Sequence, residues 1–363
     1  MKLKYVKYLF LLCLFLALPA QSQTNHQAHS YAEREDVKAF IDEMATEYSY
    51  DRMTLDALFR VAQPIASVLK AIRPPADPGI RSWRTYRSRF VEPVRIAAGK
   101  KFMQRYATEL AAAEARFGVP TEIIAAIIGI ETIYGKHTGN YTTFSALTTL
   151  AFDYPPRAKL FRQELIELLL LAREENRPIL SYTGSYAGAL GLPQFMPSSR
   201  RKYALDFDND GKIDLAASPA DAIGSAANFL AEHGWEKDGP IAQRVTVSGD
   251  GIQALLDEGI TPQHRPSELA ARDVQIQKVP EGDPKEVHGK HSAGAGDTAP
   301  GDQPNDQFCD QPAALIDLVT PNEATEYRLG YRNFYVITRY NRSSFYAAAV
   351  MDLAGTLKTD ADF

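Results

Sequence analysis

A glutamate, Glu131, lies in the most apolar stretch of the sequence. If this stretch forms a helix, its neighbours one and two turns back are Ile124, Ile127 and Ile128. Apolar surroundings disfavour a charged carboxylate and raise its pKa, as a general acid working near neutral pH requires. The alternative interpretation is a glutamate at a helix end whose side chain reaches solvent past Gly135. This stretch alone leaves both interpretations open.

A glycine-rich segment, Gly184 to Ser199, offers neutral hydrogen-bonding groups. Its closely spaced glycines let backbone amides approach a ligand, and Ser185 and Gln194 supply a hydroxyl and an amide. Such groups suit sugar hydroxyls and N-acetyl groups better than phosphates. No lysine and no strand–turn–helix pattern accompanies the glycines, so this is not a phosphate-binding or dinucleotide-binding loop. A purely structural turn explains the glycines taken alone.

An aspartate-rich segment matches the first two-thirds of an EF-hand calcium loop. Oxygen-bearing side chains stand at its first, third and fifth positions, a glycine at the sixth and an apolar residue at the eighth. The twelfth position is Ala217, so the usual bidentate glutamate is missing, and Asp221 could replace it. The alternative is a turn that binds nothing. We predict a structural calcium ion, held by Asp206, Asp208, Asp210, the carbonyl of Lys212 and Asp221.

Aromatic and amide side chains are dense between Tyr331 and Tyr346. Rings at this density suit stacking on sugars, although a buried aromatic edge would explain them as well. Within this segment we expect residues 334–338 to form a strand or an extended piece, followed by a helix over residues 343–357.

The elements that must position these side chains are mostly helical. Two short strands are expected at residues 244–248 and 273–279, with a helical piece at residues 253–258 between them. Residues 74–78 form a proline-rich linker. Residues 280–310 contain almost no large apolar side chains, which predicts a flexible insertion. Apolar periodicity predicts further helices over residues 36–48, 54–63, 101–117, 120–134, 161–175 and 221–233.

Composition excludes several classes of protein. The chain has 363 residues, of which 45% are hydrophobic and 23% charged, so neither a wholly disordered chain nor a collagen-like repeat fits. Its formal net charge of −5 argues against a nucleic-acid-binding surface spread over the whole protein.

The first 22 residues have the order of a secretory signal peptide. Three lysines precede an apolar run that ends in small residues, with cleavage expected after Ala20 or Ser22. A membrane anchor is the alternative, but the apolar run is shorter than the roughly 20 residues that a spanning helix needs. Cleavage would remove the three lysines and lower the net charge to −8. We therefore expect an exported, periplasmic protein.

The two cysteines fit this expectation. Cys13 lies inside the apolar run and follows Leu12 rather than a small residue, so a lipoprotein is not expected. Its removal leaves Cys309 alone, and the mature chain then cannot form an internal disulfide. No membrane span is expected after processing.

Together these segments resemble the lytic murein transglycosylase B family, enzymes with a goose-type-lysozyme-like core. The similarity runs from about residue 35 to residue 357, apart from the insertion. The blocks that carry it are residues 129–132, 152–157, 184–199, 221–228 and 333–341.

The resemblance implies a mainly α (α+β) fold: a lysozyme-like helical catalytic core, an N-terminal helical region and a small β-containing subdomain. The expected divisions are a signal peptide at residues 1–22, the N-terminal region at 23–100, the core with its calcium loop at 101–240, the subdomain at 241–322 and a C-terminal segment returning to the core at 323–363.

The resemblance also implies an activity. The expected enzyme cleaves the β-1,4 bond between N-acetylmuramic acid (MurNAc) and N-acetylglucosamine (GlcNAc) in peptidoglycan without water, leaving 1,6-anhydro ends and using no catalytic cofactor. Glu131 would be its single acid and base. Pro156, Ala216 and Phe229 depart from the family pattern and put fine substrate contacts in doubt. Residues expected to line the glycan groove are Tyr86, Arg157, Ser185, Gln194, Tyr340, Asn341 and Tyr346.

Two other functions stay open from sequence. A hydrolytic muramidase could use the same scaffold with water as the acceptor. A non-catalytic peptidoglycan-binding protein is the second alternative, although a complete motif around Glu131 argues against it.

Overall fold

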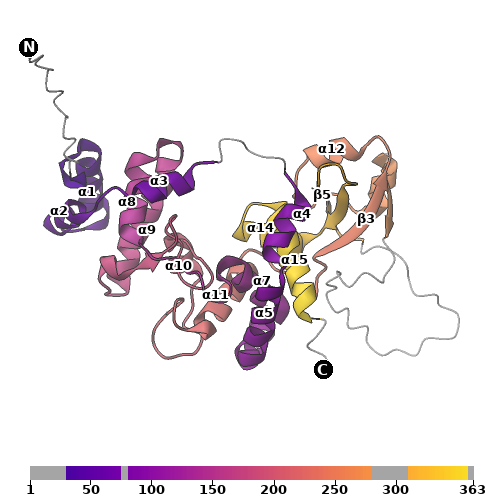
Figure 1. Ribbon diagram of the computed structural model, residues 1–363, viewed down its shortest axis with the longest axis horizontal. Helices are drawn as coiled ribbons and strands as arrows, with labels where there is room; N and C mark the ends of the chain where they lie inside the picture. Colours follow the sequence, from indigo (N-terminus) through magenta and orange to yellow (C-terminus); the bar gives the residue numbers. More distant parts are fainter. Residues whose placement is uncertain (1–29, 75–80, 273, 279–309, 359–363) are drawn as a thin grey trace, which may run out of the picture. The chain divides into compact units, whose positions relative to one another are not determined.

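The computed structural model describes residues 30–74, 81–272, 274–278 and 310–358, and the chain divides into two compact units, residues 1–61 and 62–363 (Figure 1). The expected signal peptide and nearly all of the expected insertion lie outside the described residues. No helix in the described part of the chain is both long enough and apolar enough to cross a membrane.

The first unit is a small helical hairpin. Helix α1 (Glu35–Tyr48) ends where Ser49 adopts a left-handed conformation with φ 56°, and α2 (Arg52–Val61) follows. Phe40 and Phe59 meet edge to face in its interior, with ring centroids 5.8 Å apart. The two helices expected in this region are confirmed.

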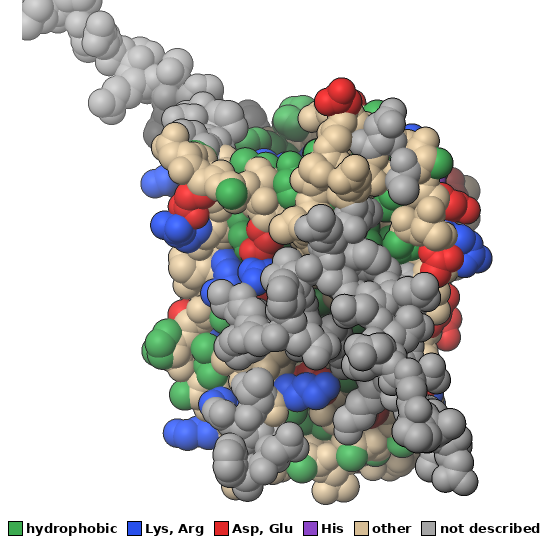
Figure 2. Space-filling view, turned by 90° about the vertical axis from the view of Figure 1, so that its right-hand side faces the viewer, with side chains coloured by type: hydrophobic (Ala, Val, Ile, Leu, Met, Phe, Trp, Pro, Cys, Tyr) green, Lys and Arg blue, Asp and Glu red, His purple; other side chains and the backbone are tan. Residues whose placement is uncertain are grey.

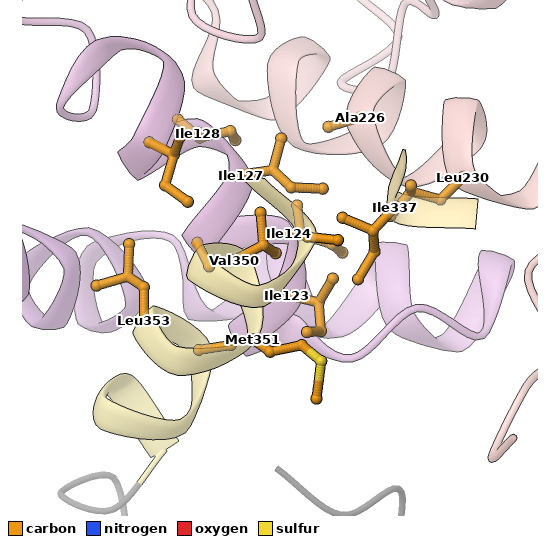
Figure 3. Packing of buried hydrophobic residues seen from close by; sticks show 14 of the residues in the cluster. Ile123, Ile124, Ile127, Ile128, Ala226, Leu230, Ile337, Val350, Met351 and Leu353 are labelled. Carbon is orange, nitrogen blue, oxygen red and sulfur yellow. The ribbon is translucent and has the colours of Figure 1, made fainter. Parts of the chain in front are cut away.

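The core of the second unit is built around helix α7 (Thr121–Thr132). Nearly every residue of this helix is buried, because helices pack against it from several sides. Figure 3 shows its isoleucines facing Val350, Met351 and Leu353 of α15 (Ser344–Lys358). On another side they face Ala226 and Leu230 of α11 (Pro219–Glu232).

The helices and short turns that complete the second unit, in chain order, are α3 (Ala66–Ile72), α4 (Trp83–Phe90), α5 (Pro93–Arg105), α6 (Ala107–Phe117), α8 (Thr143–Asp153), η2 (Pro155–Arg157), α9 (Ala158–Glu174), η3 (Ile179–Ser181), α10 (Pro197–Tyr203), α12 (Ile252–Asp257), α13 (Pro266–Leu269), η4 (Ala270–Arg272) and α14 (Arg332–Tyr340).

The single helix expected over residues 101–117 is wrong, because the structure has two helices there. The chain leaves the helical conformation at Tyr106, with φ −113° and ψ 32°, and α6 starts at once. Phe102, Tyr106, Leu110 and Ala113 keep a three- or four-residue spacing across the break. The apolar pattern therefore continues where the backbone does not.

The strand expected over residues 334–338 is also wrong, because these residues lie within α14. Aromatic and β-branched side chains favour a strand, but Phe334 and Ile337, three residues apart, are both fully buried. The helix packs against α15 and α11, so tertiary contacts decide its conformation.

A four-stranded antiparallel sheet forms the β part of this unit. Its order is β4-β3-β6-β5, and β3 pairs with β6 from Ala242 opposite Gly330 onward. Strands β3 and β4 confirm the two expected strands within the described residues. A separate two-stranded ribbon joins β1 to β2. The bounds are β1 (Tyr141–Thr142), β2 (Thr183–Gly184), β3 (Ala242–Ser248), β4 (Gln275–Lys278), β5 (Ala314–Leu318) and β6 (Glu326–Gly330).

The structure is thus mainly helical with small antiparallel sheets, as the sequence predicted. On the face shown in Figure 2, described side chains of both charges are interspersed and hydrophobic ones are scattered.

Candidate active site

Glu131 lies in the last turn of α7, and the chain turns sharply after it. Ile133, Tyr134 and Gly135 all have positive φ, at 51°, 55° and 92°. A left-handed conformation costs a residue with a side chain roughly 1–2 kcal/mol, and more where the side chain is β-branched. The amide of Ile133 still donates to the carbonyl of Gly129 at 3.0 Å, and this hydrogen bond closes the last turn of the helix.

The ring of Tyr134 fills a slot between α5 and α7. A Cβ atom added at Gly99 or Gly129 would lie 2.3 or 2.4 Å from its hydroxyl oxygen, so a larger residue at either position would displace the ring. The Nε of buried Arg95 donates to the carbonyl of Gly129 at 2.9 Å. These contacts, which the sequence analysis missed, hold the end of the helix that carries Glu131. A glycine inside so apolar a helix was the available signal.

The carboxyl group of Glu131 points toward α15 and is partly buried. Its Oε1 accepts a hydrogen bond from the hydroxyl of Tyr346 at 2.7 Å. Burial raises the pKa of Glu131 to about 7, while the bond from Tyr346 lowers it. This geometry agrees with the interpretation of a carboxyl group in apolar surroundings rather than a side chain that escapes to solvent.

Three tyrosines from three other helices surround this carboxyl group. Burial, together with the charge of Glu131, raises the pKa of Tyr86 to about 12 and those of Tyr340 and Tyr346 well above their usual value. The rings of Tyr340 and Tyr346 are stacked, with centroids 6.4 Å apart. All three phenols remain protonated at neutral pH, so they present hydrogen-bond donors around one acid.

The glycine-rich segment joins this group through Tyr340, whose hydroxyl donates to the carbonyl of Pro193 at 2.6 Å. Gln194 next to it has φ 50°, and its Nε2 donates to the carbonyls of Gly191 and Thr138 at 2.8 and 3.2 Å. Its side-chain amide therefore organises the loop.

Ser185 has a similar role in the same segment. Its Oγ accepts from the amide of Ala189 at 3.0 Å. The backbone amide of Ser185 donates in turn to the carbonyl of Ala189 at 2.9 Å. Both polar side chains expected to contact sugars are thus used to shape their own segment.

Two expected groove residues have other surroundings. Arg157 is exposed, and its guanidinium lies over the ring of Phe161, 5.1 Å from the centroid. Asn341 is exposed at the end of α14, and its carbonyl accepts from the amide of Ser343 at 2.7 Å. The structure brings Tyr86, Tyr340 and Tyr346 to Glu131, and places Arg157 at a different helix.

The aspartate-rich loop brings three carboxylates together. One oxygen from each of Asp206, Asp208 and Asp210 can be chosen so that all lie within 4.8 Å of one another. Asp206 accepts from the amides of Asp210 and Gly211, which fold the loop around it. Lys212 lies in the same loop, and its amide donates to Asp210 at 2.9 Å.

Asp221 is not placed in that group. It is buried at the start of α11, and its two carboxylate oxygens accept from the amides of Phe207 and Asp214 at 2.8 and 2.7 Å. Burial raises the pKa of Asp221 despite these bonds. In this structure Asp221 joins the two ends of the loop.

A mainly helical core with one acid in an apolar setting, surrounded by tyrosines, defines a lysozyme-like enzyme. Residues 32–355 match the family model described as the transglycosylase SLT domain. The chain is 35% identical over 345 residues to membrane-bound lytic murein transglycosylase B of Escherichia coli (strain K12), covering 93% of this chain and 86% of that protein. The chain therefore belongs to the lytic murein transglycosylase B family of enzymes.

Solved structures agree with this assignment. Soluble lytic transglycosylase SltB1 from Pseudomonas aeruginosa has a TM-score of 0.76 and 41% identity, covering 90% of this chain and all of that one. Slt35 from Escherichia coli, solved in complex with calcium, has a TM-score of 0.72 and 34% identity, covering 92% and 96%. SltB3 from Pseudomonas aeruginosa, in complex with NAG-anhNAM-pentapeptide, has a TM-score of 0.68 and 29% identity, covering 87% and 77%. The lysozyme-like core expected from sequence is confirmed.

Proposed function

We propose that this enzyme cleaves the MurNAc–GlcNAc β-1,4 bond of peptidoglycan glycan strands without water, leaving 1,6-anhydro-MurNAc ends during cell-wall remodelling or turnover. The observation that carries the proposal is the carboxyl group of Glu131, which burial holds near pKa 7 beside the Tyr346 hydroxyl. A relative of this chain has been solved with an anhydro-muramyl fragment, which supports the same product here.

The proposed reaction uses Glu131 twice. Its protonated form donates a proton to the glycosidic oxygen as the bond to C1 of MurNAc breaks, and the leaving GlcNAc gains a hydroxyl. The resulting carboxylate takes the proton from the C6 hydroxyl of the same MurNAc, whose oxygen bonds to C1. Ordinary glycosidases need two carboxylates. One suffices here because the nucleophile belongs to the substrate, and Glu131 is protonated again at the end.

The bond from Tyr346 fits this double role. It stabilises the carboxylate form of Glu131, and burial stabilises the protonated form, so the two effects oppose each other. A pKa of about 7 makes both forms accessible near neutral pH. We propose that the glycan lies along Tyr86, Arg157, Ser185, Gln194, Tyr340, Asn341 and Tyr346.

We also propose a structural calcium ion in the aspartate-rich loop. The carboxylates of Asp206, Asp208 and Asp210 fit a cation that prefers oxygen ligands, and the carbonyl of Lys212 would be a fourth ligand. Asp221, although predicted as a ligand, lies outside this carboxylate group and supports the loop through its two amide bonds. The calcium complex of Slt35 supports the same ion here.

The proposed place of action is the periplasm, reached through the signal peptide at residues 1–22, without lipid attachment. Within the mature chain the proposed divisions are an N-terminal helical region to residue 100, a catalytic core to 240, a subdomain to 322 and a returning C-terminal segment.

Mass spectrometry of digested peptidoglycan tests the function. We expect muropeptides with 1,6-anhydro ends from the wild-type enzyme and none from Glu131→Gln. Reducing ends that carry an added water would instead identify a hydrolytic muramidase on this scaffold. An unchanged yield of anhydro ends from Glu131→Gln would contradict the assignment of the acid.

A further inference from the structure

The hydroxyl of Thr132, the residue after Glu131, connects the catalytic helix to the glycine-rich segment, and the proposed reaction gives it no role. Its Oγ1 donates to the carbonyl of Leu192 at 3.0 Å and accepts from the amide of Gly135 at 3.0 Å. Thr132 is only 1% exposed, so bulk water does not reach either bond. The hydroxyl thus uses both its donor and its acceptor capacity on backbone groups of two different segments.

The bond from Gly135 holds the turn that follows the acid. Ile133 and Tyr134 both adopt the left-handed conformation, so the helix cannot continue through them. Such residues persist only where surrounding contacts fix them. The amide of Gly135 donates to the side chain of Thr132, and the amide of His137 donates to its carbonyl at 2.9 Å. One residue therefore supplies two acceptors to the turn that ends the catalytic helix.

The bond to Leu192 fixes the glycine-rich segment relative to the same acid. The next carbonyl of that segment, Pro193, accepts from Tyr340, one of the tyrosines beside the acid. Two successive carbonyls are thus held by side chains next to the reacting group. The amide of Leu192 donates to the carbonyl of Leu215 in the aspartate-rich loop at 2.8 Å. The backbone of Leu192 therefore connects that loop, through the hydroxyl of Thr132, to the end of α7.

Packing within the helix does not account for this hydroxyl. A threonine in a helix often bonds the carbonyl four residues back, and here that carbonyl, Ile128, lies 3.3 Å away. The bond that leaves the helix, to Leu192, is shorter at 3.0 Å. Thr148 on α8 gives the contrasting case, because its hydroxyl is equally buried but has no hydrogen-bond partner within the described residues.

We propose that Thr132 is a positioning residue for the reaction, whose hydroxyl fixes the direction of the Glu131 side chain and keeps the glycine-rich segment aligned with it. The inference rests on the proposed role of Glu131 and adds a residue that touches neither the substrate nor the transferred proton. Without the hydroxyl, a buried amide and a buried carbonyl would lose a partner, and the turn would relax. The carboxyl group would then shift relative to the hydroxyl of Tyr346. A displacement of about 1 Å at a reacting group can lower a rate about 100-fold.

The variant Thr132→Val tests this role, because valine replaces the hydroxyl by a methyl group and keeps the shape of the side chain. We expect kcat on peptidoglycan to fall about 10- to 100-fold, with KM changed by less than about 3-fold. The alkaline limb of the pH–rate profile should move to higher pH, because a longer bond from Tyr346 lowers the pKa of Glu131 less. Thr132→Ser, which keeps the hydroxyl, should stay within about 3-fold of the wild-type kcat.

Thr148→Val is the matched control, since it makes the same change of atoms at a buried hydroxyl without a hydrogen-bond partner among the described residues. It should leave kcat and the alkaline limb unchanged. Thermal unfolding curves set an assay temperature at which every variant is folded. If Thr132→Val does not fold, Thr132→Ala takes its place, with the same expected directions for kcat and for the limb.

Two results would overturn the proposal. A lower Tm for Thr132→Val, with kcat and the alkaline limb as in wild type, would show a purely structural residue. An equal loss of kcat in Thr132→Ser would show that the hydroxyl is not responsible. Hydrated ends in the wild-type digests would overturn the proposed function instead. The comparison of Thr132→Val with Thr148→Val needs only a rate of bond cleavage, so it could still be made.

Discussion

A single carboxyl group has to serve as acid and then as base, and the residues around Glu131 show how this is arranged. Burial alone would favour the protonated form. The hydroxyl of Tyr346 counters this at 2.7 Å, and the high pKa of that phenol keeps it a donor throughout. The sequence could predict the apolar neighbours of Glu131 because they lie on its own helix. It could not show that Tyr346, 215 residues later, supplies the opposing hydrogen bond.

The variant Glu131→Gln should lose activity by a factor of about 10²–10⁴, the usual contribution of a general acid or base. Gln keeps the size of the side chain but cannot transfer the proton. Release of anhydro-muropeptides measures the loss. Glu232→Gln, an exposed glutamate on α11, serves as the control and should keep full activity. Residual activity within 10-fold of wild type would show that another group supplies the proton.

Glu131→Gln should also change stability in a pH-dependent way. The folded-state pKa of Glu131, about 7, lies above its value of 4.5 in an unfolded chain. Its contribution to stability is therefore fully present below pH 4.5 and is lost as the pH rises through 7. The glutamine variant lacks this loss. We expect its free energy of unfolding, relative to wild type, to rise by about 3 kcal/mol between pH 4.5 and 8. Urea unfolding at both pH values measures this, and a constant difference would contradict a raised pKa.

The variant Tyr346→Phe should move the alkaline limb of the pH–rate profile to higher pH. The hydroxyl of Tyr346 lowers the pKa of Glu131, so its removal raises that pKa and keeps the acid protonated over a wider range of pH. The expected displacement is about one pH unit, because a hydrogen bond to a charged group contributes roughly 1.5–3 kcal/mol. A limb that moves to lower pH would show that Tyr346 stabilises the protonated form.

At the scale of secondary-structure elements, the sequence predicted most helices but not how their ends meet. Helix α7 was predictable because its isoleucines make it apolar on every side. The break at Tyr106 was hidden by continuing periodicity, and α14 looked like a strand because its aromatic and β-branched residues favour one. For α14, contacts with α15 and with α11, which is distant in sequence, override local preference.

The slot around Tyr134 gives a testable case at this scale. Gly129→Ala would place a Cβ 2.4 Å from the Tyr134 hydroxyl, so the ring must move and the end of α7 with it. We expect a loss of about 1–3 kcal/mol in stability together with reduced kcat. Tyr134→Phe removes only a buried hydroxyl that has no hydrogen-bond partner within the described residues, so it should be neutral or slightly stabilising. Thermal unfolding of both variants checks the contrast, and equal stability would contradict it.

At the scale of the whole molecule, buried charges connect the sheet to the catalytic helices. Arg328 on β6 donates to Asp352 on α15 at 2.8 Å, and Arg87 on α4 donates to the other oxygen of Asp352 at 2.5 Å. Those two helices also carry Tyr346 and Tyr86, which lie beside Glu131. The sheet thus helps to align the tyrosines across a distance in sequence that no local pattern could have predicted.

The calcium loop acts on the stability of the second unit as a whole. At a calcium concentration 100 times its Kd, binding to the folded state alone adds about 2.7 kcal/mol. For a chain of this size that raises Tm by roughly 3–5 °C over the chelated protein. Calorimetry with calcium and with chelator measures the difference. A Tm insensitive to both would contradict the proposed calcium site.

Variants in this loop should distinguish residues that bind the calcium ion from residues that stabilise the loop by hydrogen bonds. Asp208→Asn should abolish the response to calcium while leaving Tm in chelator nearly unchanged, because Asp208 is an exposed member of the carboxylate group. Asp221→Asn should lower Tm in both conditions, since one of its two buried amide bonds is lost when an oxygen becomes an NH₂ group. If Asp221→Asn instead abolished only the calcium response, then Asp221 would be a ligand of the ion rather than a support of the loop.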